Sequence, residues 1–137
     1  MKEPQAFTMS ITPFTASGAI DEDAFRAHLR RMVDSGVGVY LGSPGTGEGH
    51  SLSQVELEFV YRVGVEECKG KTPIYANVRE GRNAQEVIER VRLAENAGVD
   101  VIQIYTVDAG HGMRPTYAEQ HAYYREVLDQ ISAPVGL

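Results

Sequence analysis

Four glycines stand within eight positions in the segment G-S-P-G-T-G-E-G, residues 42–49, directly after the apolar run V-G-V-Y-L. A glycine-rich segment in this position lets a ligand approach backbone N–H groups, which together can bind an anion. The first and third glycines have the spacing of a phosphate-binding P-loop, but Glu48 occupies the position of the P-loop lysine and would repel phosphate. Two interpretations remain open: a nest for a small carboxylate, assisted by the hydroxyls of Ser43 and Thr46, or a tight turn without a ligand.

A second group of reactive side chains lies in the segment 105–114, Y-T-V-D-A-G-H-G-M-R. Asp108 and His111 would need a third ligand to hold a metal ion, and only His50 offers itself, so a metal site is disfavoured. His111 has the chemistry of an acid or base for the variable part of a substrate, and Arg114 that of a clamp for a carboxylate or hydroxyl. Bracing of the loop is an equally good interpretation of both residues.

Three further polar residues stand at the ends of apolar runs. Asn77 and Tyr105 could line a pocket there, although packing with a satisfied polar tip is the favoured interpretation of Tyr105. Thr12 is expected to support the segment 42–49 through a hydrogen bond.

The elements that must position these residues repeat with a regular period. The helix-capping residues Asp21, Ser53, Asn83 and Thr116 are 32, 30 and 33 positions apart. Each is followed by apolar residues at helical spacing, for example Val55, Phe59, Val60 and Val63 after the second cap. Short apolar runs precede the caps, so we expect strands over 7–12, 37–41, 73–78, 99–105 and from 134 onward.

Strand–helix alternation with near-continuous apolar strands predicts a parallel sheet covered by helices. The 137 residues suffice for a single domain, 1–137. Length alone favours a flavodoxin-like open sheet, which would be a binding or regulatory domain without catalysis. The alternative is a (β/α)8 TIM-barrel, of which the chain would supply about four βα units and the start of strand 5.

Composition disfavours several classes of partner. The net charge is −6 and the arginines are scattered, which argues against nucleic acid. No apolar stretch approaches the ~20 residues that cross a bilayer, and the N-terminus does not have the apolar core of a signal peptide. The single cysteine, Cys68, cannot form an intrachain disulfide and is interpreted as a packing residue. We therefore expect a cytoplasmic protein with no membrane partner.

Several segments together carry a family likeness. I-T-P-F-T-A-S-G-A-I-D, P-G-T-G-E-G-H-S-L-S-Q-V-E, K-T-P-I-Y-A-N-V, A-E-N-A-G-V-D-V-I-Q-I and R-P-T-Y-A-E-Q-H-A-Y-Y occur in this order. In order and spacing they resemble the N-terminal half of the dihydrodipicolinate synthase/N-acetylneuraminate lyase family. The likeness covers essentially the whole chain.

The resemblance implies a TIM barrel whose lysine forms a Schiff base with a 2-keto acid, usually pyruvate, without a cofactor. It also implies that the loop after strand 2 holds the carboxylate of the keto acid, with Thr46 and Gly47 matching the family's second Thr and its Gly. Gly45 stands at the family's first hydroxyl position, so only its N–H is available there, and Ser43 could substitute for the hydroxyl. Glu48 matches a loop-fixing acceptor. The family is commonly tetrameric, which implies a homo-oligomer (dimer or tetramer).

The chain also departs from the family pattern. Family members that make dihydrodipicolinate have P-Y-Y after strand 4, whereas Gly112 occupies the position of the second tyrosine here. A different aldolase or dehydratase specificity is therefore expected, within a broader class of Schiff-base lyases that also includes synthases. The chain's lysines are Lys2, Lys69 and Lys71, and the last two fall at the N-terminal face of a barrel. The family's Schiff-base lysine and strand-5 tyrosine would lie beyond Leu137, so the 137 residues alone are expected to be inactive.

Overall fold

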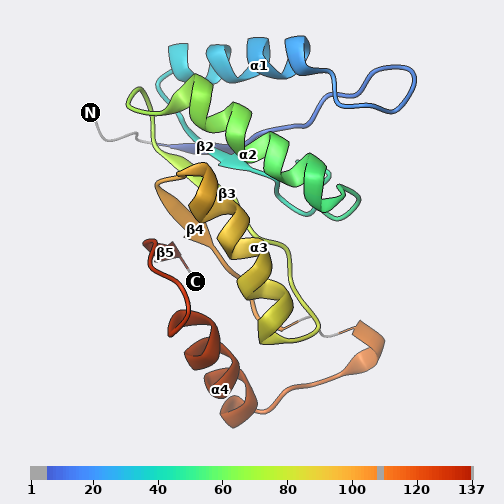
Figure 1. The fold of residues 1–137 in the computed structure, drawn as a ribbon, viewed down its shortest axis with the longest axis vertical. Helices are drawn as coiled ribbons and strands as arrows, with labels where there is room; N and C mark the ends of the chain where they lie inside the picture. Colours follow the sequence, from blue (N-terminus) through green and yellow to red (C-terminus); the bar gives the residue numbers. More distant parts are fainter. Residues whose placement is uncertain (1–5, 108–109, 137) are drawn as a thin grey trace.

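Five strands alternate with four α-helices in the computed structural model, which describes residues 6–107 and 110–136 (Figure 1). In chain order the elements are β1 Phe7–Met9, α1 Glu22–Asp34, β2 Gly38–Leu41, α2 Gln54–Cys68, β3 Ile74–Asn77, α3 Ala84–Ala97, β4 Val101–Gln103, the short 3-10 helix η1 Gly110–Gly112, α4 Tyr117–Leu128 and β5 Val135–Gly136.

The strands form one parallel sheet in the order β1-β2-β3-β4-β5. Each new strand is added to the same edge, after a helix that crosses back over the sheet. A flavodoxin-like sheet has the order 2-1-3-4-5 because its chain reverses direction after the first unit. The flavodoxin-like alternative is therefore wrong, and the sequential order is the one that a (β/α)8 barrel requires.

The strands are shorter than the apolar runs that predicted them. β1 ends at Met9, although the N–H of Ser10 still donates to the carbonyl of Tyr40 at 2.8 Å. β4 ends at Gln103, but Ile104 continues the ladder by donating to the carbonyl of Gly136 at 3.1 Å. The residues just beyond β1 and β4 are thus still held at the carboxyl edge of the sheet.

All four predicted helix caps are present. The side chains of Asp21, Ser53, Asn83 and Thr116 each accept a hydrogen bond from the backbone N–H three residues ahead. At Ser53 and Thr116 the side chain of the glutamate three residues later also accepts from the backbone N–H of the capping residue, which completes a capping box. These caps fix where each helix begins, and therefore the length of the loop that leads into it.

The core lies between the sheet and its layer of helices. Val39, Leu41, Ile74, Ala76 and Ile102 face the helices and have no exposed surface. They pack against buried residues of the helices, which include Phe25, Leu29, Val60, Tyr61, Val63 and Val91.

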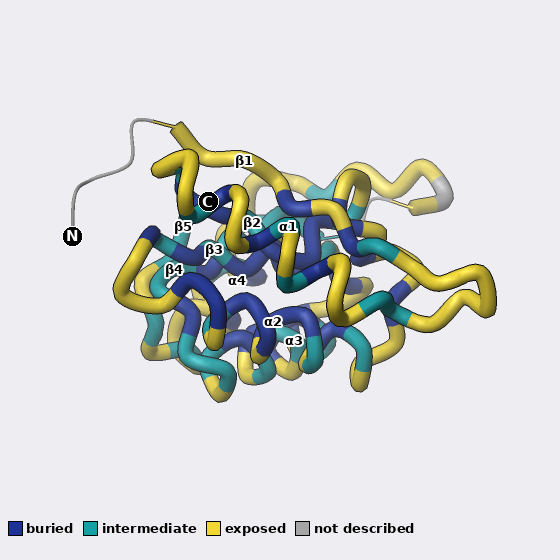
Figure 2. The backbone as a smooth tube through the Cα atoms, turned by 90° about the horizontal axis from the view of Figure 1, so that it is seen from above, coloured by how far each residue is buried: buried dark blue, intermediate teal, exposed yellow. Residues whose placement is uncertain are grey.

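The other face of the sheet corresponds to the inside of a closed barrel. The ring of Phe7 contacts the ring of Tyr75 with centroids 4.4 Å apart, and Tyr75 contacts Tyr40 at 4.7 Å. Phe7 and Met9 remain 38% and 47% exposed, and β1 is exposed along its length (Figure 2). This chain by itself therefore leaves the aromatic face open.

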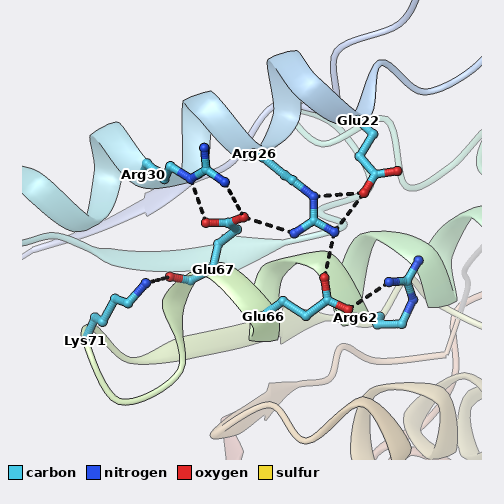
Figure 3. A network of polar contacts seen from close by, with 7 residues as sticks. All are labelled: Glu22, Arg26, Arg30, Arg62, Glu66, Glu67 and Lys71. Atoms are coloured by element: carbon cyan, nitrogen blue, oxygen red, sulfur yellow. Dashed lines mark hydrogen bonds and ion pairs between the residues drawn. The ribbon is translucent and has the colours of Figure 1, made fainter.

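An ion-pair network joins α1 to α2 on the outer surface (Figure 3). The carboxylate of Glu67, only 10% exposed, accepts two hydrogen bonds from Arg30 and one from Arg26. These bonds, those of Arg30 first, lower the pKa of Glu67 to about 2 against the opposing effect of burial. Arg26 also pairs with Glu22 and Glu66. The network fixes the first two helices relative to each other, on the side away from the open face.

No helix in residues 6–107 and 110–136 combines the length and the apolar character that a bilayer crossing would require.

Candidate functional site

The segment 42–49 forms a closed loop at the carboxyl end of β2. Ser43 is buried, and both its hydroxyl and its carbonyl oxygen accept from the N–H of Gly47, at 2.9 and 3.2 Å. The N–H of Gly49 donates to the same carbonyl at 2.9 Å. The hydroxyl of Ser43 thus closes the loop, and its predicted role as a substitute hydroxyl for a ligand stays a prediction.

Thr12 ties this loop to the segment that follows β1. Its hydroxyl donates to the carbonyl oxygen of Gly47 at 2.7 Å, and the residue is only 5% exposed. The predicted hydrogen bond is therefore present. Since Gly47 uses both its N–H and its carbonyl oxygen inside the protein, its part in the site is to hold the loop rather than to offer a free donor.

Gly45 and Thr46 lie at the exposed tip of the loop. Within the described part of the chain, neither backbone N–H donates a hydrogen bond, and the hydroxyl of Thr46 makes none either. Successive unpaired N–H groups on a fixed loop form an anion-binding nest. The donors of the predicted site are thus these two amides and the Thr46 hydroxyl.

Glu48 supports the loop through its backbone. Its carbonyl oxygen accepts from the N–H and the hydroxyl of Ser51 and from the N–H of Leu52. Its φ is +56°, in the left-handed region that non-glycine residues seldom occupy. The carboxylate itself is half exposed and lies 4.0 Å from the ring of His50.

Asn77 and Tyr105 meet at the carboxyl ends of β3 and β4. The Tyr105 hydroxyl donates to Oδ1 of Asn77, and the Tyr61 hydroxyl of α2 donates to the Asn77 carbonyl oxygen at 2.9 Å. Tyr105 is half-buried and Asn77 has no exposed surface. Burial raises the pKa of both tyrosines, so the two phenols stay protonated and act as donors.

Arg114 and His111 belong to a different part of the carboxyl face. Arg114 is exposed and lines a pocket of about 590 Å³, together with Val107, Met113 and residues of α3 and α4. None of residues 42–49 lines that pocket, so the structure does not bring Arg114 to the glycine loop. His111 is part of η1, but its side chain and all of Asp108 lie outside the described residues.

Lys69 and Lys71 lie at the opposite end of the sheet, as predicted. Nζ of Lys69 pairs with Asp100 at 2.6 Å and donates to the carbonyl of Gly98 at 2.7 Å. Nζ of Lys71 donates to the carbonyl of Glu67 at 2.8 Å. Both amines precede β3, whereas the loop 42–49 follows β2. Lys2 lies outside the described residues.

Two other chemistries find little support in the described residues. No three histidine, cysteine, aspartate or glutamate side chains gather there in a cluster that could hold a metal ion. Cys68 is fully buried, and burial raises the pKa of its thiol to about 11, so it is a packing residue rather than a nucleophile. The hydrogen-bond donors described above at the loop 42–49 and at Asn77 are all neutral groups.

Comparison with known sequences identifies relatives that match nearly the whole of this chain. A 4-hydroxy-tetrahydrodipicolinate synthase from Methylobacterium radiotolerans is 31% identical over 130 residues, which are 95% of this chain and 42% of the relative. A probable 5-dehydro-4-deoxyglucarate dehydratase from Streptomyces coelicolor is 36% identical over 129 residues, 91% of this chain and 38% of the relative. The chain thus spans about two fifths of the length of these curated relatives.

Solved structures show the same fold. A dihydrodipicolinate synthase from Bacillus anthracis superposes with a TM-score of 0.85 at 21% identity, covering 98% of this chain and 45% of that one. A prophage protein of E. coli K12 from the dihydrodipicolinic acid synthase family, solved in complex with pyruvate, has a TM-score of 0.83 at 26% identity. It covers 95% of this chain and 42% of that one. The fold is therefore of the (β/α)8-barrel type, as predicted, with four βα units and β5 present here.

The chain also matches the sequence model of a whole family. The model of the dihydrodipicolinate synthetase family matches residues 3–137, nearly the entire chain. The two relatives of this chain named above are a synthase and a dehydratase, both lyase-type enzymes. The chain belongs to the dihydrodipicolinate synthetase family.

Proposed function

We propose that this chain is one half of a single-domain barrel that forms a Schiff base with pyruvate or a related 2-keto acid. The "complete barrel" below means this chain joined to the second half that its relatives have. The proposal assigns the carboxylate of the keto acid to the nest formed by the N–H groups of Gly45 and Thr46. The E. coli relative that was solved with pyruvate supports this choice of ligand.

The observation that carries the proposal is the division of hydrogen bonds within the loop 42–49. The hydroxyls of Thr12 and Ser43 and both backbone polar groups of Gly47 are engaged inside the protein and hold the loop in one shape. The amides of Gly45 and Thr46 have no partner in the described part of the chain. A rigid loop with adjacent unpaired N–H groups is preorganised for an anion, because no internal bond must break when the ligand binds.

The chemistry then follows from the ligand's orientation. With the carboxylate held at the nest, the keto carbon is presented to a lysine supplied by the second half of the barrel. That amine attacks the keto carbon, water leaves, and an imine forms between the lysine and the keto acid. Lys69 and Lys71 cannot supply the amine because they lie at the amino-terminal end of the sheet. The 137 residues alone are therefore proposed to be inactive.

The test is reductive trapping on the complete barrel. Incubation with pyruvate and borohydride should reduce the imine to a stable secondary amine, which adds the mass of the reduced pyruvyl group to one lysine outside this chain. Thr46→Val removes one hydroxyl donor. The pyruvate concentration that half-saturates trapping should therefore rise by about tenfold. Ser17→Ala removes an exposed hydroxyl in the turn before α1 and serves as the control. Absence of any adduct on the wild-type barrel would reject the proposal.

The family likeness extends the proposal to the assembly and the compartment. We propose that the complete protein is a cytoplasmic homo-oligomer, a dimer or a tetramer. Light scattering after size-exclusion chromatography measures the assembly directly, and a monomeric mass would contradict that part of the proposal.

A further inference from the structure

His50 contacts the peptide group that carries one of the two donors of the nest. Nδ1 of its ring lies 2.6 Å from the carbonyl oxygen of Pro44, and its backbone N–H donates to the same oxygen at 3.3 Å. That oxygen belongs to the peptide bond between Pro44 and Gly45, whose N–H is one of the two amides assigned to the keto acid. His50 is therefore bonded directly to a donor group at the exposed tip of the loop 42–49.

Bonds to this oxygen fix the direction of the Gly45 N–H. The peptide is trans, so its C=O and its N–H point in opposite directions within one plane. Two donors on the carbonyl oxygen hold that plane in place. A hydrogen bond to the carbonyl also polarises the peptide group and strengthens its N–H as a donor. The Gly45 N–H is thus held pointing away from the His50 ring, and it has no internal partner among the described residues.

The same contact determines which ring nitrogen carries the proton. A carbonyl oxygen only accepts, so Nδ1 is the protonated nitrogen of the neutral ring and Nε2 has the lone pair. Nε2 lies 4.0 Å from the carboxylate of Glu48, and the side chains of His50 and Glu48 are 62% and 49% exposed. A second proton at Nε2 therefore leaves the bond to Pro44 intact and places a positive charge beside Glu48.

Glu48 gives this charge a consequence for the nest. Its carboxylate belongs to the same loop as the two donor amides, and a negative charge there repels the carboxylate of a keto acid. Protonated His50 pairs with Glu48 and offsets this repulsion. Histidine is the side chain whose charge ordinarily changes between about pH 5 and 8. Binding of an anion at the nest should therefore respond to pH in that range.

The other charged groups near His50 come from the segment after β3 and from α3. Nη1 of Arg79 donates to the backbone carbonyl of His50 at 2.8 Å. Within α3, Glu86 pairs with Arg90. Together with Pro44 and His50, the described residues that line a cavity of about 390 Å³ here are Arg79, Glu80, Arg82, Glu86 and Arg90. His50 is the one histidine in this described lining, so it is the group there that ordinarily changes charge near neutral pH.

We propose that His50 is a positioning residue for the carboxylate nest: its Nδ1–H orients the Gly45 N–H, and protonation of its Nε2 tightens binding of the keto acid. The inference rests on the proposed function above. The bond to Pro44 acts throughout the range from about pH 5 to 8, whereas the charge acts only toward the acidic end of that range.

Two variants of the complete barrel separate the bond from the charge. His50→Asn keeps an N–H donor at the position of Nδ1 but carries no charge, whereas His50→Phe keeps a flat ring and removes both. The measurement is the pyruvate concentration that half-saturates trapping by cyanoborohydride, at about pH 6 and about pH 8. The reacting lysine also responds to pH, but equally in all proteins. The quantity compared is therefore the ratio of each variant's concentration to that of the wild type at the same pH.

The two variants should differ at both pH values. At about pH 8 the ratio for His50→Asn should lie within about twofold of one, and that for His50→Phe should be about three- to tenfold, the range for one lost hydrogen bond. At about pH 6 the ratio for His50→Asn should rise by about two- to fivefold, because the wild type then has a charge that the variant does not have. The urea midpoint of both variants should stay near the wild-type value, because the side chain is exposed.

His121→Asn is the matched control, since it makes the same substitution at an exposed histidine of α4. Its ratio should stay near one at both pH values. A ratio near one for His50→Phe at about pH 8 would overturn the inference, as would a ratio for His50→Asn that is the same at both pH values. A lower urea midpoint with unchanged trapping is the pattern of a purely structural histidine and would also overturn it. If the wild type traps no pyruvate at either pH, the proposed function is rejected and the inference falls with it.

Discussion

Replacing Gly49 by alanine should disrupt the glycine loop, and the structure indicates how severely. A Cβ atom at this position would lie 2.1 Å from the carbonyl oxygen of Gly42, 2.9 Å from the carbonyl carbon of the same residue and 3.0 Å from the oxygen of Ser43. Real Cβ atoms essentially never approach other atoms to less than 3.0 Å. All three neighbours are backbone atoms, so no side chain can turn aside. Relief requires the loop itself to move.

The expected loss of stability is about 1–3 kcal/mol, the usual range for atoms forced into a packed region. Urea denaturation of the complete barrel measures this loss as a lower midpoint with an unchanged slope. Because movement of the loop displaces the nest, Gly49→Ala should also raise the pyruvate concentration that half-saturates trapping, by about tenfold or more.

Gly45→Ala is the matched control for stability in the same loop. A Cβ atom at Gly45 meets no atom within 4 Å, and this glycine is not among those with positive φ. The denaturation midpoint of this variant should stay at the wild-type value. Equal midpoints for Gly49→Ala and Gly45→Ala would refute the loop geometry on which the site depends.

Three further predictions concern single contacts. Thr12→Val leaves the Gly47 carbonyl without its donor and should cost about 1–3 kcal/mol in urea denaturation, whereas Thr12→Ser should stay close to wild type; equal losses for the two variants would contradict the role of the hydroxyl. Glu67→Gln should destabilise the protein by about 1.5–3 kcal/mol at neutral pH. Because the folded pKa of Glu67 is lowered from 4.5 to about 2, the difference between wild type and variant should persist above pH 4.5 and shrink as the pH falls toward 2. A difference that does not change with pH would contradict the Arg30 pairing. Cys68 should not react with a thiol reagent at about pH 8 until the protein unfolds, and rapid labelling of the folded protein would show that its burial is wrong.

The order and boundaries of the helices could be predicted from the sequence because the signals are local. A cap such as Ser53 with Glu56 acts within one helical turn, so four residues contain the whole interaction. The signal that ends α3 is equally local, since Gly98 adopts the left-handed conformation that glycine favours, with a φ of +88°.

Which side of a helix becomes buried was harder to predict. Val55 follows the cap of α2 and was expected on its apolar stripe, yet it is 76% exposed. The buried side of α2 instead includes Tyr61 and Gly64. The absence of a side chain at Gly64 lets the helix approach Leu41 of β2 closely. Spacing alone gives several nearly equivalent faces on a helix with many apolar residues, and contact with the sheet chooses among them.

The division of roles within the site depends on contacts between distant residues. Thr12 and Gly47 are separated by 35 positions. Only the fold shows that the N–H and the carbonyl oxygen of Gly47 both form hydrogen bonds that hold the loop. The contacts of Asn77 with Tyr61 and Tyr105 are likewise invisible in the sequence, because they join residues 16 and 28 positions apart. The family resemblance points to the loop 42–49 as a candidate site, but it does not tell which atoms of the loop remain free.

A crystal structure of the complete barrel, reduced with borohydride in the presence of pyruvate, would test the proposed carboxylate site most directly. We predict a lysine adduct outside residues 1–137, with the pyruvyl carboxylate within hydrogen-bonding distance of the N–H groups of Gly45 and Thr46. A carboxylate bound elsewhere, for example at Arg114, or an adduct on Lys69 or Lys71, would contradict it.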